Sequence, residues 1–489
     1  MKQIYAFAIC VFLSFFSFIS NAQTEGSAFT LTGMGVSTPF ARDYQTLRIN
    51  PANLDIESPY NKSITLGFFQ TGVSLYSEIL TKTELRQNIF REDIKNFDRA
   101  QQLEYATAFA QSKNVIDVDL TSFGFSVQLP KAGSFGFSVN DRVNFYSSLG
   151  PQISELMWLG NTAAYFENLI LANGDTITNN PTISQDTLDQ VIQGITSLQN
   201  AQSLSQLTKG TEMRFSWVRE FNLGWGKKIV SNDNWEIYGG IGIKFLVGQG
   251  MLNIKSDGTQ ANAFSALSPV FKIDYDTLAN NNPSSLDNGA PPLTPVGLGF
   301  GFDIGTTIIF KEKFILSASV NDIGSITWDG NIYKLKDLDL TNFNTNGLES
   351  VNFVDQIEQL NGGDGLLEWQ GSEKVTTKLP TTMRLGFGYE NHPHFKVGID
   401  LIAPLNDDIS SIEKPVIAVG GEYSPIPWIH LQAGVVQGGN YGTKIPLGIY
   451  FTIGEGSWEF GASSRDAFTF FRDNEPTISA AFGFLRFRM

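Results

Sequence analysis

Residues 383–401 read MRLGFGYENHPHFKVGIDL, and this stretch decides the fold. From Met383 to Tyr389 every second side chain is apolar, and the same period of two resumes from Phe395 to Leu401 after an Asn-His-Pro turn. Alternation with this period is typical of β-strands that have one apolar and one polar face. The stretch therefore predicts an antiparallel β-hairpin.

The same alternation recurs along the rest of the chain. It predicts fourteen strands, near residues 62–76, 116–129, 134–146, 212–229, 235–249, 296–310, 313–328, 376–390, 394–405, 413–423, 427–438, 443–454, 457–471 and 476–488. Connections after even-numbered strands are tight turns, such as 130–133 and 311–312, whereas long connections follow the first odd-numbered strands. Short turns at one end and long loops at the other are typical of outer-membrane barrels, and a soluble β-protein has no reason to follow this rule.

We therefore expect an all-β fold, namely a 14-stranded antiparallel transmembrane β-barrel. Roughly 12 to 16 strands are compatible with the spacing. The expected domains are a signal peptide at 1–22, an N-terminal hatch or plug at 23–60, and the barrel at 61–489.

The first 22 residues have the pattern of a secretory signal peptide. Lys2 supplies the positive start, residues 4–19 form an apolar core, and Ser20-Asn21-Ala22 is a cleavage site of small residues. The only cysteine, Cys10, lies inside the apolar core, so the mature chain is not a lipoprotein and has no disulfide or thiolate metal site. We expect Sec export to the outer membrane of a Gram-negative bacterium.

Composition excludes other classes of protein. The chain has 489 residues and a formal charge of −15, whereas nucleic-acid binding needs clustered Lys and Arg. A polytopic helical membrane protein needs several apolar runs of about 20 residues, and the mature chain has none. Much of the acidity falls in the connections 147–211, 250–295 and 329–375, which we expect to be surface loops.

Three stretches in the loops have apolar residues at helical spacing, at 78–112, 151–170 and 186–206. We expect partly helical extracellular loops that cover the outer mouth of the barrel. Asp337-Leu338-Asp339 could hold Ca²⁺, but it lacks the spacing of a known calcium loop, and solvation explains it as well. No metal or cofactor is expected.

The two faces of the strands predict the surroundings of their side chains. The apolar face would meet lipid, and the small polar face would line the lumen. Aromatic residues near strand ends suit interfacial girdles: Tyr76, Tyr146, Trp225, Trp235, Trp328, Tyr423, Trp428 and Trp458. Strand parity directs a set of charged side chains toward the lumen: Arg214, Glu220, Asp303, Arg384, Glu390, Lys396, Asp400, Glu422 and Glu459.

These charges have two interpretations. They could line a path for a solute, or they could be salt bridges that tie the barrel wall to a plug, since isolated charges in a narrow barrel need partners. Both signs occur along the wall rather than in one ring, which favours the salt-bridged interior.

Catalysis has little support in the sequence. The three histidines, His392, His394 and His430, all fall at the short-turn end, and no third metal ligand lies near the first two. No P-loop, dinucleotide fingerprint or HExxH motif is present. We therefore expect no enzyme activity.

Several motifs resemble a known family. Gly33-Met34-Gly35, Arg42-Asp43-Tyr44 and Asn50-Pro51-Ala52-Asn53-Leu54, followed by fourteen strands, resemble the FadL superfamily of fatty-acid and hydrocarbon transporters and the type IX secretion barrel PorV. Residues 47–52, 123–127 and 320–328 are more closely similar to an uncharacterised FadL-like family, domain of unknown function 5723. The resemblance implies that Asn50, Pro51 and Ala52 form the hatch motif.

Two functions follow as expectations. The first is a monomeric barrel, embedded in outer-membrane lipid, that transports hydrophobic or amphipathic small molecules through a path gated by the hatch. The second is a non-transporting scaffold that binds surface or secretion proteins through loops 147–211 and 329–375. The charged lumen departs from the apolar path that the FadL resemblance implies.

Overall fold

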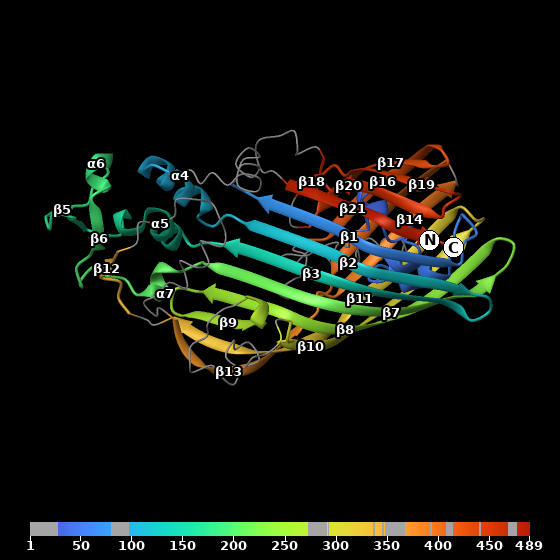
Figure 1. The fold of residues 1–489 in the computed structure, drawn as a ribbon, viewed down its shortest axis with the longest axis horizontal. Helices are drawn as coiled ribbons and strands as arrows, with labels where there is room; N and C mark the ends of the chain where they lie inside the picture. Colours follow the sequence, from blue (N-terminus) through green and yellow to red (C-terminus); the bar gives the residue numbers. More distant parts are fainter. Residues whose placement is uncertain are drawn as a thin grey trace, which may run out of the picture.

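The computed structural model shows a closed antiparallel β-barrel, and it confirms the expected fold class (Figure 1). It describes residues 28–79, 97–271, 291, 293–335, 338–344, 347, 367–391, 394–406, 414–439, 442–467 and 477–489. The predicted signal peptide and His392 lie outside these residues.

Fourteen strands form the barrel wall. They are β1 (Ile64–Ser77), β2 (Asn114–Leu129), β3 (Gly133–Ser148), β7 (Glu212–Ser231), β8 (Trp235–Ser256), β10 (Gly297–Phe310), β11 (Phe314–Leu335), β14 (Thr382–Asn391), β15 (Phe395–Pro404), β16 (Val416–Ile426), β17 (Ile429–Gly438), β19 (Leu447–Ile453), β20 (Trp458–Ser464) and β21 (Thr477–Arg488). Each predicted segment overlaps one of them. The barrel closes where β1 pairs with β21, from Thr65 opposite Arg488 to Tyr76 opposite Thr477.

Three further strands join the wall toward the long-loop end. β9 (Ala261–Leu267) pairs with both β8 and β11, and β13 (Leu367–Lys378) continues along β11 beyond the end of β14. The short β18 (Thr443–Lys444) pairs with β17. The wall is therefore taller around β8 and β11 than around β14 to β20.

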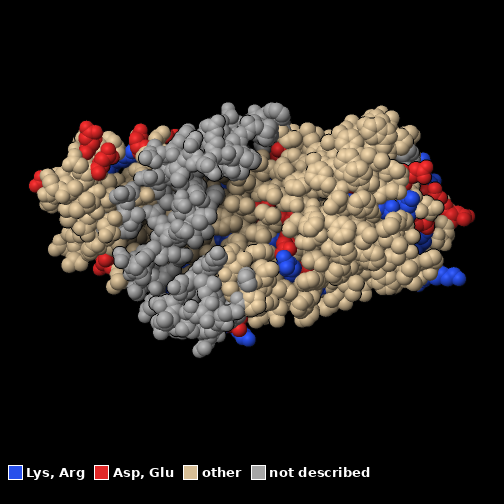
Figure 2. All heavy atoms as spheres, in the orientation of Figure 1, with Lys and Arg blue, Asp and Glu red and all other residues tan. Residues whose placement is uncertain are grey.

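The outward face is apolar, as strand parity predicts. On β10, the side chains of Leu298, Phe300, Phe302 and Ile304 are each more than half exposed. Figure 2 shows a flank of the barrel with few charged groups, most of which gather toward the two ends. Such a band suits lipid rather than water. No helix in the described part of the chain is long and apolar enough to cross a membrane.

Aromatic side chains form a girdle near the short turns. Trp235 and Phe310 have ring centroids 4.4 Å apart, and Phe314 and Tyr389 have centroids 5.1 Å apart. Trp428 and Trp458 are also exposed. The expectation was wrong for three of the eight girdle candidates, because Tyr76, Tyr146 and Trp328 are buried.

A β-bulge in β11 explains the position of Trp328. Phe302 pairs with Ile323, but Ile304 pairs with Val320, so Asn321 and Asp322 together face the single residue Asp303. Asp322 adopts φ 60°, a left-handed conformation that Asp tolerates better than most residues. One extra residue reverses strand parity, so Ile326 and Trp328 point inward rather than toward lipid.

The long loops fold into a cap at the opposite end from the short turns (Figure 1). The cap contains α4 (Arg99–Phe109), α5 (Pro151–Leu159), η3 (Gly160–Thr162), α6 (Gln185–Leu188), α7 (Leu204–Leu207) and a four-stranded sheet of β12 (Asn342–Phe343), β6 (Val191–Ile195), β4 (Asn168–Leu171) and β5 (Thr176–Thr178). Its buried core includes Trp158, Phe109, Phe166 and Leu169.

The cap corrects two expected helices. A helix over 186–206 was wrong, because Val191 to Ile195 form a central strand of the small sheet. β-Branched residues there favour a strand, and Gly194 admits the close approach of Phe166. The helix expected over 151–170 ends at Leu159. Of the helix expected over 78–112, residues 99–109 are helical, and residues 80–96 lie outside the described part.

Residues 28–60, which we call the plug, lie within the barrel near the short turns (Figure 1). The plug contains α2 (Phe29–Thr32) and two 3₁₀ helices, η1 (Asp43–Thr46) and η2 (Pro51–Asp55). η2 contacts β7, β8 and β10, and α2 contacts β19, β20 and β21. The plug therefore touches strands on opposite sides of the wall.

Candidate functional site in the barrel lumen

The Asn50-Pro51-Ala52 motif anchors the plug to the wall. The side chain of Asn50 accepts a hydrogen bond from the backbone N–H of Ala52 at 3.1 Å and so caps η2. Its Nδ2 donates to Oγ1 of Thr307 on β10 at 3.0 Å. The backbone of Ala52 lies so close to β8 that a Cβ at Gly240 would be 2.3 Å from its nitrogen. These side chains are buried, and η2 packs closely against the wall.

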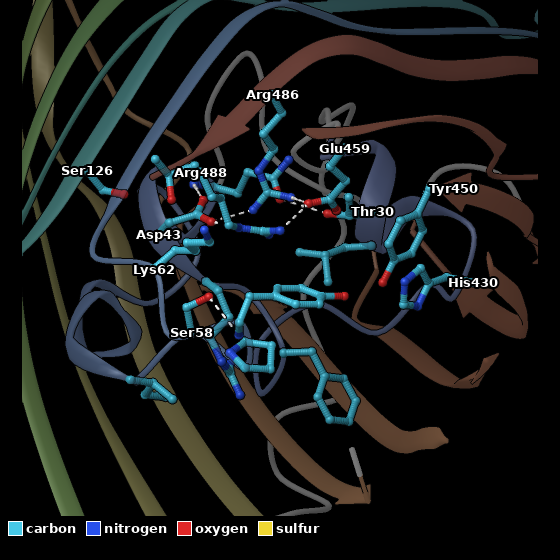
Figure 3. Close-up of a pocket in the computed structure, with 18 of the residues that line it drawn as sticks. Thr30, Asp43, Ser58, Lys62, Ser126, His430, Tyr450, Glu459, Arg486 and Arg488 are labelled. Atoms are coloured by element: carbon cyan, nitrogen blue, oxygen red, sulfur yellow. Dashed lines mark hydrogen bonds and ion pairs between the residues drawn. The ribbon is translucent and has the colours of Figure 1, made fainter. Parts of the chain in front are cut away.

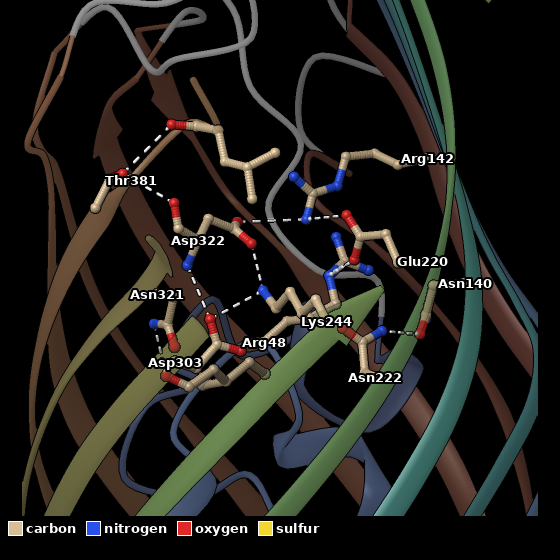
Figure 4. A network of polar contacts seen from close by, with 12 residues as sticks. Arg48, Asn140, Arg142, Glu220, Asn222, Lys244, Asp303, Asn321, Asp322 and Thr381 are labelled. Carbon is tan, nitrogen blue, oxygen red and sulfur yellow. Dashed lines mark hydrogen bonds and ion pairs between the residues drawn. The ribbon is translucent and has the colours of Figure 1, made fainter. Parts of the chain in front are cut away.

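A buried ionic network links the plug to the middle of the lumen (Figure 4). Arg48 of the plug lies 3.0 Å from Asp119 on β2 and 3.2 Å from Glu220 on β7. Arg142 on β3 connects Glu220, at 3.0 Å, to Asp322 in the bulge of β11, at 3.4 Å. These charges are almost fully buried, so each depends on its partners to offset the loss of water.

Lys244 on β8 completes this network. Its Nζ lies 3.0 Å from Asp303 on β10 and also pairs with Asp322. The backbone N–H of Asp322 donates to the Asp303 carboxylate at 2.8 Å. The bulge therefore places Asp322 where Lys244 and Arg142 can share its carboxylate.

A second ionic cluster lies below the plug, near the short turns (Figure 3). Arg486 and Arg488 on β21 lie 2.8 and 2.7 Å from Glu459 on β20. Asp43 of the plug also pairs with Arg486, and it lies 3.7 Å from Arg488. A single carboxylate of the plug thus joins a cluster that otherwise belongs to the wall.

Other contacts between plug and wall use charged residues of β14 and β15. Arg42 lies 3.2 Å from Glu390, and the carboxylate of Asp400 accepts from the backbone N–H groups of Ser37 and Thr38 at 2.8 and 2.9 Å. Charge-assisted bonds of this kind are stronger than neutral ones. The plug is held by these polar contacts and by a buried apolar cluster that it shares with Tyr238, Ile309 and Ile315 of the wall.

Cavities lined by residues that the structure describes lie beside these contacts. The turn-side cavity, of about 80 Å³, lies below the plug and is lined by residues that include Asp43, Gln45, Lys62, Glu459 and Arg488. The loop-side cavity, of about 40 Å³, lies above it, beside Gln45, Arg48, Asp119 and Arg384. The tryptophan cavity, also about 40 Å³, has apolar lining residues that include Val218, Met251, Ile326, Trp328 and Leu379, and charged ones, namely Arg142, Glu220 and Lys378.

Gln45 lines both the turn-side and the loop-side cavity. Its Oε1 accepts a hydrogen bond from Thr30 Oγ1 at 2.7 Å, and its Nε2 donates to Gln70 Oε1 on β1 at 3.0 Å. Gln70 in turn donates to the hydroxyl of Tyr44. A layer of neutral polar side chains therefore separates the two cavities.

Comparison with known proteins gives the family. The model named "Family of unknown function (DUF5723)" matches residues 51–463. The chain belongs to DUF5723.

Among solved structures, this DUF5723 chain is similar to a TodX deltaS2S3 mutant monoaromatic hydrocarbon channel, with a TM-score of 0.48 at 10% identity, over 95% of this chain and 99% of that one. The P. putida toluene transporter TodX gives a TM-score of 0.44 at 10% identity, over 96% and 99%. A Pseudomonas aeruginosa FadL homologue gives 0.41 at 12% identity, over 96% and 97%. The search of curated proteins gave no match.

The predicted lumen residues of this DUF5723 barrel fall into four groups. Glu220 and Asp303 belong to the central network, and Glu459 belongs to the cluster beside Asp43. Glu390, Asp400 and Arg384 lie against the plug. Arg384 contacts Ser37 of the plug at 3.4 Å. Lys396 lies next to this group and pairs with Glu390 at 3.8 Å and with Glu422 at 3.3 Å. Arg214 pairs with Glu212 near the long loops, away from the plug.

Several residues of the site were missed from the sequence. Asp119, Arg142, Lys244, Arg486 and Arg488 occupy inward positions that strand parity could have found. Asp322, Ile326 and Trp328 could not be found that way, because the bulge shifts the parity of β11. The plug partners Asp43 and Arg48 lie in a segment without a period.

His430 of the DUF5723 barrel lies in a hydrogen-bonded cluster. Its Nδ1 contacts Ser424 Oγ at 2.8 Å and Glu422 at 3.3 Å, and its ring stacks on Tyr450 with centroids 4.2 Å apart. A Ser-His-acid triad places the serine and the acid on opposite nitrogens of the ring, whereas here they share one. This arrangement therefore does not activate Ser424.

Proposed function

We propose that this protein is an outer-membrane channel for small hydrophobic or amphipathic molecules, closed by the plug and opened when part of the plug moves. The observation that carries the proposal is the position of Gln45, which lines a cavity on each side of the plug. Displacement of this one side chain and its neighbours would join the two cavities. A plug that served only to stabilise the barrel would not need a cavity on each side of a thin layer of polar side chains.

The tryptophan cavity supports an amphipathic solute. Trp328, Ile326 and Leu379 offer an apolar surface, and Arg142 and Lys378 also line the cavity. Binding sites for small molecules usually combine an apolar lining with a few placed polar groups. The cavity lies on the loop side of the central network, where a solute from outside would arrive.

The part of the plug that moves is, in this proposal, Asp43–Arg48, which we call the gate segment. Asp43 and Arg48 have φ of 49° and 73°, and non-glycine residues in this region carry a strain on the order of 1 kcal/mol each. η2 has no such residue, and the buried side chain of Asn50 holds it to β10. The Asn50-Pro51-Ala52 motif then serves as the fixed end of the hatch.

Deletion of residues 28–48 from the full chain tests the proposal. The expected result is a steady ion conductance in planar bilayers and faster uptake of an amphipathic dye by proteoliposomes. The control is a deletion of residues 173–175 in the cap, which leaves the plug intact. A deleted barrel that keeps its heat-resistant mobility on gels but conducts no more than the parent protein would contradict the channel function.

The scaffold function rests on a different observation. The cap has its own apolar core, yet Ile192 and Leu198 are 52% and 77% exposed on it. A scaffold would lose its partners when these side chains become Ser, with no change in conductance. Co-purification from cross-linked cells, compared with the parent protein, separates this function from transport.

A further inference from the structure

The cluster of Asp43, Glu459, Arg486 and Arg488 mixes wall and plug (Figure 3). The wall contributes two guanidinium groups and one carboxylate, so without Asp43 it has one positive charge more than it can pair. Arg486 is 2% exposed and Glu459 is 3% exposed, while Asp43 is 11% exposed. Asp43 is thus the acidic member of the cluster that is most accessible from the turn-side cavity.

This charge count limits how the gate segment can open. Moving Asp43 away would leave Glu459 as the only carboxylate paired with two buried guanidinium groups, and a buried charge that loses a partner destabilises the fold strongly when nothing replaces that partner. The strain at Asp43 and Arg48 offsets a part of this cost and not the whole. Opening at this end therefore requires another anion in the place of Asp43.

The turn-side cavity offers room and further positive charge for such an anion. Lys62 lines the cavity, and among the described residues it forms no ion pair. The other acidic groups of the lining are already engaged: Glu390 pairs with Arg42, Glu422 with Lys396, and Glu459 with Arg486 and Arg488. Figure 3 shows Lys62, Asp43 and Arg488 on one side of the same opening. A volume of about 80 Å³ suits a small oxyanion.

We propose that the turn-side cavity is a binding site for a small oxyanion, a carboxylate or a phosphate-like group, held by Lys62, Arg486 and Arg488. The anion takes the place of the Asp43 carboxylate on the two arginines and releases the gate segment. Asp43 is in effect an internal competitor for the site. The inference rests on the proposed function for its consequence, but binding itself can be measured without any transport.

The test is calorimetric titration of the full mature protein in detergent with sodium sulfate and, separately, sodium acetate at constant ionic strength. Asp43→Asn removes the competitor and is expected to tighten binding at least tenfold. Lys62→Gln in the Asp43→Asn background is expected to weaken it at least tenfold. Lys131→Gln, on the exposed turn after β2, is the matched control and should change nothing. If the protein binds sulfate and not acetate, the site is for phosphate-like groups. If it binds acetate and not sulfate, the site is for carboxylates.

Two results would overturn the inference: no heat of binding for either anion in Asp43→Asn, or binding that Lys62→Gln leaves unchanged. Arg488→Gln gives a second check if Lys62→Gln does not fold. The bilayer conductance of the parent protein in sulfate, compared with that in chloride, then measures how far anion binding opens the gate segment. If deletion of residues 28–48 opens the barrel but neither anion binds, the channel function stands and the anion site fails. If an anion binds but the barrel that lacks residues 28–48 does not conduct, the anion site is confirmed and the gating function is wrong.

Discussion

Nη1 of Arg48 lies 3.0 Å from Oδ2 of Asp119, and this ion pair fastens one end of the gate segment to β2. The other end, Asp43, is fastened to Arg486 on β21. Asp43 and Arg48 both have positive φ. Gln45, which lies between them in the sequence, has a polar side chain that separates the turn-side and loop-side cavities. The segment is therefore strained within itself and held by charge at both ends.

Arg48→Gln removes one of these fastenings. Asp119 and Glu220 lose a buried partner, and breaking such a pair typically costs about 3–5 kcal/mol. Because Arg142 still neutralises Glu220, we expect a smaller loss, confined to the plug. Limited proteolysis should cleave residues 40–50 faster than in the parent protein, while the barrel keeps its melting temperature. Lys131→Gln is the matched control, and equal protection of the plug in both variants would contradict this assignment.

Asn50 has two separable roles, and two variants distinguish them. Asn50→Asp keeps the cap on the N–H of Ala52 but loses the donor to Thr307, whereas Asn50→Ala loses both. We expect a loss of about 2 kcal/mol for Asn50→Ala and a larger loss for Asn50→Asp, whose unpaired carboxylate would be buried against the carbonyl oxygen of Thr306, both measured by urea unfolding of the plug. Equal stability of Asn50→Ala and the parent protein would show that the motif is not the anchor.

Gly420 permits the plug to approach β16. A Cβ at this position would lie 1.9 Å from the carbonyl oxygen of Met34, which is backbone and cannot rotate away. Gly420→Ala should therefore push the plug off the wall and expose it to protease. Gly242→Ala is the control, because its Cβ meets the side chain of Asp303 at 3.2 Å. Similar cleavage rates for both variants would count against close packing at Met34.

Trp328→Ala tests the tryptophan cavity. The indole is 2% exposed, and its Nε1 donates to Thr377 Oγ1 at 3.0 Å. Removing it enlarges the cavity and costs about 3–5 kcal/mol. Binding of a fluorescent amphiphile should weaken, whereas Trp458→Ala on the exposed girdle should leave it unchanged. An amphiphile that binds both variants equally would place its site elsewhere.

The cap should loosen in acid through Glu167. Its pKa is lowered because the backbone N–H of Ser197, at 2.8 Å, and the side chain of Asn200 donate to the carboxylate. A lowered pKa means that this stabilisation is present above the ordinary carboxyl value of about 4.3 and is lost as pH falls through the folded value. The amide protection factors of residues 195–200, which correct the exchange rates for their intrinsic pH dependence, should therefore fall on going from pH 7 to pH 3. Glu167→Gln should show low protection factors at these residues already at pH 7 and little further change toward pH 3.

The sequence predicted the wall far better than its contents. Period-two alternation located all fourteen strands, because each strand needs one face for lipid and one for the lumen. Parity also directed Glu220, Asp303 and Glu459 inward. It failed above Asp322, where one extra residue reverses the faces, and it said nothing of Asp43 or Arg48, whose positions depend on long-range ion pairs.

The bulge at Asp322 gives β11 two halves with opposite orientation. In the half toward the short turns, small polar side chains such as Ser317 and Ser319 point into the lumen. In the other half, Ile326 and Trp328 point into the lumen. Deleting one residue there would turn the upper half over, so that the indole faced lipid and Thr327 faced the lumen. A single insertion in evolution could thus have supplied an apolar binding surface at once, with no substitution of any side chain.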